Sequence, residues 1–151
     1  MILIIDFGSQ FNQLIARRVR ENGVYCQVEP ASAAMQKIRE LNPAGIILSG
    51  GPASIYEDNS PAVDKDIFTM GIPILGICYG MHLMLDALGG TIRRARKREY
   101  GFARLEIPSS EETIFKEIEN ETQCWMSHGD SAEKLPAGFA VIASTENTRV
   151  A

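Results

Sequence analysis

Histidine, cysteine and tryptophan are scarce in this 151-residue chain. Cys26, Cys78 and Cys124 lie far apart, so their spacing fits neither a disulfide framework nor a metal-binding knuckle. Without a disulfide pattern, a reducing compartment is the simplest environment, and we expect a cytoplasmic protein. The only histidines are His82 and His128, and no metal ligand set is expected from them.

Long apolar runs are also absent. No run approaches the roughly 20 residues that a membrane span needs. The apolar start, residues 1–5, meets Asp6 at once and lacks the basic region of a signal peptide. The net charge of -4 argues against a general nucleic-acid binder. We therefore expect a protein that binds neither membranes nor nucleic acid.

Short apolar runs alternate with amphipathic patterns over the first ninety residues. The runs predict strands, at 1–6, 24–28, 45–48 and 74–77, and the patterns between them predict helices, at 9–22, 33–41, 64–70 and 81–88. This alternation predicts an α/β fold with three layers and a doubly wound, mostly parallel sheet. The later part predicts a mixed or antiparallel portion, with strands at 91–98, 103–107, 124–126 and 139–144 and a short helix at 112–118. We expect one domain over 1–151.

The segment 76–80, Gly-Ile-Cys-Tyr-Gly, is typical of a nucleophile elbow built around Cys78. A predicted strand precedes it and a helical pattern follows it, which is the context that the motif needs. The two glycines let the backbone turn tightly, and the start of the helix is expected to favour the thiolate of Cys78. A buried structural cysteine is the alternative.

Two other loops are expected beside the elbow. In parallel sheets, sites form where strands end at their carboxyl edge. The turn after Asp6 and the Gly50-Gly51 loop both follow such strands. The glycine loop lacks the Lys-Ser/Thr of a phosphate-binding loop, so a nucleotide site is not predicted there.

Five segments in this order resemble the class I glutamine amidotransferases. They read IIDFGSQ at 4–10, LSGGPAS at 48–54, GICYG at 76–80, REYG at 98–101 and WMSHGD at 125–130. The resemblance covers nearly the whole chain. Its first and last segments are most similar to the glutaminase domains that supply ammonia for the ATP-dependent amination of XMP to GMP. The resemblance implies the flavodoxin-like version of the predicted fold.

The resemblance also implies site residues. Cys78 would attack the side-chain amide of L-glutamine, and the backbone N–H groups of Gly51 and Tyr79 would hold the oxyanion. Other residues implied to contact glutamine are those of the 125–130 segment and the position four after the nucleophile: Ser127, His128, Gly129 and His82. No metal or organic cofactor is implied on this domain, since ATP and Mg would belong to the synthetase domain or subunit that is its partner.

The sequence departs from the family in two respects. His82 stands where the family usually has Gln, so the substrate contact would be altered, because an imidazole donates and accepts only from two separate nitrogens. In addition, the family's catalytic base and its orienting acid lie in a His-Pro-Glu segment that does not occur in these 151 residues. We therefore expect a C-terminally shortened glutaminase domain with impaired activity.

Two other functions stay open at this point. One is a different α/β cysteine hydrolase that uses the same elbow with His128 as base and Asp130 as its orienter. The other is a binding or docking subunit without catalysis. The basic run at 93–98 is expected to be a solvated hairpin, or else a docking surface for the synthetase. Trp125, the only tryptophan, is expected to pack between the late strands and the sheet.

Overall fold

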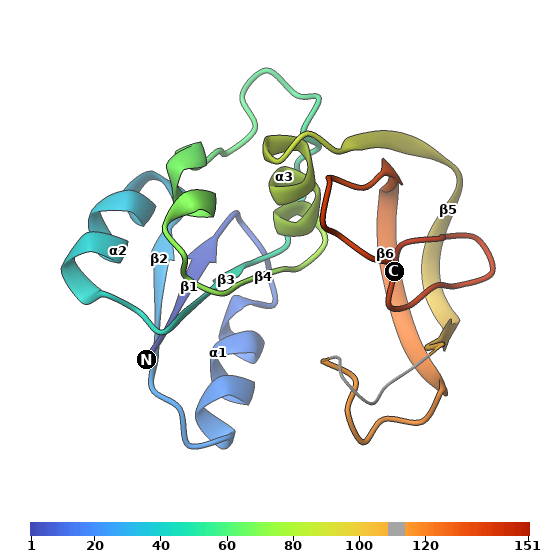
Figure 1. Ribbon diagram of the computed structural model, residues 1–151, viewed down its shortest axis with the longest axis horizontal. Coiled ribbons are helices and arrows are strands. Elements are labelled where there is room, and N and C mark those ends of the chain that lie inside the picture. The colour runs from blue at the N-terminus through green and yellow to red at the C-terminus, as the bar shows by residue number, and fades with distance from the viewer. Residues whose placement is uncertain (109–113) are drawn as a thin grey trace. The chain divides into compact units, whose positions relative to one another are not determined.

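The computed structural model describes residues 1–108 and 114–151, without the side chains of 95–99 (Figure 1). The chain divides into two compact units, Met1–Leu88 and Gly89–Ala151. None of the helices in the described part is long and apolar enough to cross a membrane.

The first unit is built on a parallel sheet of four strands in the order β2-β1-β3-β4, namely β2 (Cys26–Pro30), β1 (Ile2–Asp6), β3 (Gly45–Leu48) and β4 (Ile74–Gly76). Ile4 lies opposite Val28 on one side and Ile47 on the other. The strand order reverses at β1, as in flavodoxin-like sheets. The predicted doubly wound, mostly parallel sheet is therefore confirmed for this unit.

Helices cover both faces of this sheet, and the burial pattern of β1 shows why. Alternate side chains of a strand point to opposite faces. Ile4 packs with α1 (Asn12–Glu21) through Ala16. Leu3 and Ile5 pack in the other cluster, which also holds buried residues of three helices: α2 (Ala34–Leu41), the 3₁₀ helix η2 (Lys65–Thr69) and α3 (Tyr79–Ala87). A second 3₁₀ helix, η1 (Ala31–Ala33), leads into α2. The three predicted layers are present.

The second unit contains one long antiparallel pair, β5 (Thr91–Glu106) and β6 (Glu121–Lys134). From Glu99 opposite His128 to Glu106 opposite Glu121 the register is regular, and it shifts between Arg94 and Glu99. The strands predicted at 91–98 and 103–107 are thus one continuous strand, β5, and the strand predicted at 124–126 is part of the longer β6.

Several expectations for the second unit were wrong. Residues 114–117 form turns instead of the end of a helix, and the start of that predicted helix lies outside the described residues. The segment 139–144 makes only an isolated bridge, between Ser144 and Glu106. Trp125 does not pack inside, since 73% of it is exposed. It lies opposite Phe102, on the same face of the hairpin.

Candidate active site

The backbone of Cys78 adopts an uncommon conformation between β4 and α3. Its dihedral angles are φ 47° and ψ -112°, and it is the residue that immediately precedes the first turn of the helix. Residues with a Cβ rarely adopt a positive φ, and such strain concentrates at functional sites. The turn leaves the residue exposed, whereas Tyr79 and Gly80 after it are buried. The predicted strand–turn–helix elbow is therefore present.

Both glycines of the elbow are needed for steric reasons. A Cβ on Gly76 would lie 2.6 Å from the Cα of Met81 in the first turn of α3. A Cβ on Gly80 would overlap the backbone oxygen of Leu48 and lie 2.6 Å from its Cβ. These approaches let α3 start directly against β3 and β4. The sharp turn at Cys78 depends on that close packing.

The glycine loop after β3 lies beside the elbow. A Cβ on Gly50 would stand 3.5 Å from the Cβ of Cys78 and 4.0 Å from the Oγ of Ser9. A Cβ on Gly51 would stand only 2.5 Å from the carbonyl oxygen of Phe7. The turn after β1, the glycine loop and the elbow therefore meet, as expected for the carboxyl edge of a parallel sheet.

Gly51 and Tyr79 present backbone N–H groups in this region. No acceptor for either group is found among residues 1–108 and 114–151. Tyr79 is held firmly, since its ring packs 5.3 Å from the ring of Phe7 and its hydroxyl donates to the carbonyl oxygen of Pro61 at 2.6 Å. N–H donors fixed in advance of the reaction are what an oxyanion site requires.

The thiol of Cys78 does not show the expected preference for the thiolate. Partial burial raises its pKa above the ordinary 9.0, and burial is the only cause acting on this pKa within the described part of the chain. The residue is exposed on one side, but the surrounding loops displace part of the water that would solvate a thiolate. A proton acceptor is therefore needed before Cys78 can attack.

The other predicted contacts are placed differently. His82 lies one turn along α3, where its N–H donates to the Cys78 carbonyl oxygen at 3.0 Å, and its side chain is buried. Ser127, His128 and Gly129 belong to β6 in the second unit, so their part in a site with Cys78 stays a prediction.

The geometry of His128 bears on the alternative of a hydrolase with a His128–Asp130 pair. The Nδ1 atom of His128 lies 3.0 Å from the backbone oxygen of Asp130. That contact orients the ring through the backbone, and a catalytic role for the Asp130 carboxylate stays a prediction. Within the described residues, no group of three or more metal-binding side chains comes together.

Sequence reasoning missed Ser49, which is fully buried behind the site. Its Oγ accepts the N–H of Phe7 at 3.1 Å and donates to the carbonyl oxygen of Gly50 at 2.9 Å. One hydroxyl thus joins the turn after β1 to the glycine loop. A serine directly after a buried strand and before two glycines was the available signal.

The family model for glutamine amidotransferase class-I matches residues 3–151. The chain belongs to this family. Among curated relatives of this class I amidotransferase, a glutamine-hydrolyzing GMP synthase from Heliobacterium modesticaldum is 57% identical over 146 residues, which are 97% of this chain and 28% of that protein. Another from Natranaerobius thermophilus is 49% identical over 151 residues, 100% of this chain and 29% of that protein. The chain thus spans less than a third of the length of these relatives.

Solved structures agree with the fold. A protein from Thermoplasma acidophilum that is assigned as a subunit of GMP synthase has a TM-score of 0.81 at 26% identity, over 99% of this chain and 74% of that one. A glutamine amidotransferase from Thermotoga maritima has a TM-score of 0.79 at 21% identity, over 97% of this chain and 67% of that one. The α/β fold of this amidotransferase is therefore shared with both.

Proposed function

We propose that this chain carries the nucleophile and the oxyanion site for glutamine hydrolysis in GMP synthesis. The observation that carries the proposal is the strained, exposed Cys78 at the start of α3, next to the glycine loop. We infer glutamine as the substrate from membership of the amidotransferase family, and GMP as the destination of the nitrogen from the GMP synthase relatives.

In the proposed first step, the Cys78 sulfur attacks the side-chain amide carbon of L-glutamine after losing its proton. The carbonyl oxygen becomes an oxyanion, which the N–H groups of Gly51 and Tyr79 stabilise. As this intermediate collapses, its C–N bond breaks and the nitrogen takes up the proton that Cys78 had lost, so that ammonia departs and a glutamyl thioester stays on Cys78. Water then cleaves the thioester to give glutamate and the free thiol.

The raised pKa of Cys78 shows what else this chemistry needs. A protonated thiol is a weak nucleophile, and a base beside it has to accept the proton. Because burial alone acts on this pKa among the described residues, we expect weak turnover by residues 1–151 on their own. The site itself needs no metal or organic cofactor, while ATP and Mg would act on the synthetase partner.

A chimera tests this function directly. Residues 1–151 would replace the matching region of the Heliobacterium relative, and GMP formation from XMP and ATP would be measured with glutamine or with ammonia as nitrogen source. We expect glutamine-dependent activity that is lost in Cys78→Ala, while ammonia-dependent activity is kept. Glutamine-dependent activity that survives Cys78→Ala would rule out the proposed nucleophile.

A further inference from the structure

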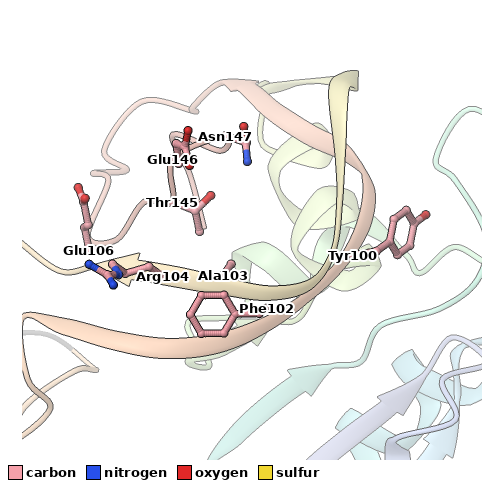
Figure 2. Close-up of a pocket in the computed structure, with 8 residues that line it drawn as sticks. All are labelled: Tyr100, Phe102, Ala103, Arg104, Glu106, Thr145, Glu146 and Asn147. Atoms are coloured by element: carbon pink, nitrogen blue, oxygen red, sulfur yellow. The ribbon is translucent and has the colours of Figure 1, made fainter.

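The second unit holds a cavity of about 520 Å³ between β5 and residues 145–147 (Figure 2). All of its lining residues belong to that unit, and none of them has been assigned to the nucleophile or the oxyanion site. In the first unit, by contrast, a long loop carries one of the two proposed oxyanion donors. What holds this loop in place therefore bears directly on the chemistry at Cys78.

The loop spans residues 49–64, all of them described, and connects β3 to η2 without a helix or strand of its own (Figure 1). Connections longer than roughly 12–15 residues without such elements are uncommon and often belong to functional sites. Gly51 lies near the start of the loop, shortly after β3 ends. The direction of the Gly51 N–H therefore depends on how the rest of the loop is fixed.

Tyr79, which carries the other donor, holds the far part of the same loop. Its hydroxyl donates to the carbonyl oxygen of Pro61 at 2.6 Å. Its ring is buried in the core cluster of the first unit, and three apolar side chains of the loop pack against that cluster, namely those of Ala53, Ile55 and Val63. The residue after the nucleophile thus anchors the loop by a hydrogen bond and by apolar packing.

Phe7 connects the two donors at the near end of the loop. A Cβ on Gly51 would lie 2.5 Å from the carbonyl oxygen of Phe7 and 3.3 Å from its Cβ, so the backbone of Gly51 rests directly on Phe7. The ring of Phe7 in turn packs on the ring of Tyr79, with their centroids 5.3 Å apart. The two donor residues are therefore joined through Phe7 at one end of the loop and through Pro61 toward the other.

We propose that the side chain of Tyr79 is a positioning residue for glutamine hydrolysis. Its hydroxyl holds the loop through Pro61, and this contact keeps the Gly51 N–H aimed at the same oxygen as the N–H of Tyr79 itself. The inference rests on the proposed function, because an oxyanion forms only if Cys78 attacks an amide carbon. The hydroxyl is bonded to Pro61 and the ring is buried against Phe7, so the side chain acts through the loop and not on the substrate.

Tyr79→Phe isolates the contribution of the hydroxyl, because it keeps the backbone N–H and the packing of the ring. Loss of a whole oxyanion donor lowers kcat by about 10²–10³-fold, and a donor that is only less well aimed should cost less. We expect kcat for glutamine hydrolysis to fall about tenfold. The KM for glutamine should change by less than about twofold, because the oxyanion forms only after the substrate has bound.

The test uses the chimera of residues 1–151 in the Heliobacterium relative, with glutamate release measured against glutamine concentration. In parallel, the alkylation rate of Cys78 by iodoacetamide is measured by mass mapping. Alkylation displaces iodide at a saturated carbon and forms no oxyanion, so its rate should stay within about twofold in Tyr79→Phe. The matched control is Tyr25→Phe, which removes the hydroxyl of a tyrosine that is 64% exposed and should change neither reaction.

A second variant tests the loop side of the contact. Pro61→Gly keeps the carbonyl oxygen that accepts the hydrogen bond but frees the backbone there. It should lower kcat about threefold when Tyr79 is present and by less in Tyr79→Phe, because both changes act on one contact. Fully additive losses of the two variants would contradict the proposed route through Pro61.

The outcomes separate this inference from the function on which it rests. If the unmodified chimera releases glutamate and Tyr79→Phe has the same kcat, the positioning role is overturned and the proposed function stands. Equal losses in glutamate release and in alkylation would mean that the hydroxyl only stabilises the fold, which also overturns the positioning role. A chimera that does not release glutamate before any substitution would overturn the proposed function itself.

Discussion

The amide of Gly80 donates a hydrogen bond to the carbonyl oxygen of Ser49 at 3.0 Å, joining the nucleophile turn to the glycine loop. This bond is possible because Gly80 has no Cβ to meet Leu48. The position of Cys78 relative to the Gly51 N–H therefore depends on the packing of α3 against β3. Several consequences of that packing can be measured.

Gly80→Ala should destabilise the first unit although alanine is the better helix former. Helix propensity favours alanine by about 1 kcal/mol, but overlap with Leu48 costs about 1–3 kcal/mol or more. We expect a lower urea midpoint and slower labelling of Cys78 by a glutamine analogue. Gly23→Ala, at a left-handed position with open space around it, should lower stability without changing Cys78 labelling.

Ser49→Ala should loosen the glycine loop. It removes the acceptor of the buried Phe7 N–H, and an unsatisfied buried donor costs about 1–3 kcal/mol. We expect that loss of unfolding free energy in urea, together with reduced labelling of Cys78. The control is Ser32→Ala at an exposed serine, which should change neither. Unchanged stability of Ser49→Ala would show that the hydroxyl does not hold the two loops together.

Cys78→Gly and Cys78→Ala should reveal the strain at the elbow. Glycine normally costs about 0.5–1 kcal/mol relative to alanine, whereas a strained backbone costs a residue with a Cβ about 1–3 kcal/mol. With φ at 47° and ψ at -112°, position 78 should make the glycine variant at least as stable as the alanine variant. The comparison Ala87→Gly in α3 should show the ordinary loss. An equal loss at both positions would mean that Cys78 is not strained.

The rate at which Cys78 reacts with alkylating agents should keep rising with pH, up to a higher pH than is usual for a cysteine. Burial disfavours the charged thiolate and raises the pKa above 9.0, so the thiol stays protonated where a free cysteine would already be ionised. Its alkylation rate with iodoacetamide should keep rising above pH 9, and at each pH exceed that of the buried Cys26. The same protein in urea provides the ordinary titration. A plateau below pH 8 would indicate a stabilised thiolate instead.

The sequence pattern predicted the strands and turns of the first unit well, but those of the second unit less well. The continuous apolar run before Asp6 and the glycines around Cys78 have few alternatives, because a buried strand and a tight turn require those residue types. The hairpin was harder to predict, because Gly101 suggested the end of a strand. In the structure β5 continues through Gly101, which has φ 97°. The exposure of Trp125 could not be predicted, because its preference for burial gives no information about which face is covered.

The site was predictable in its residues but not in its electrostatics. The helix start suggested a thiolate, whereas burial raises the pKa of Cys78, and the loops around it come from three separate parts of the sequence. The basic run was only partly testable. Arg93 forms an exposed ion pair with Glu133 at 3.0 Å, whereas the side chains of Arg96 and Lys97 lie outside the described residues. The docking role suggested for them stays a prediction.

The most direct measurement is the mass-mapped labelling of the 151-residue chain with a diazo-ketone analogue of L-glutamine. We predict one adduct at Cys78, slowed by L-glutamine but not by D-glutamine, and absent from Cys78→Ala. Labelling of Cys26 or Cys124 at the same rate, or no protection by L-glutamine, would contradict the assignment of Cys78 as the nucleophile.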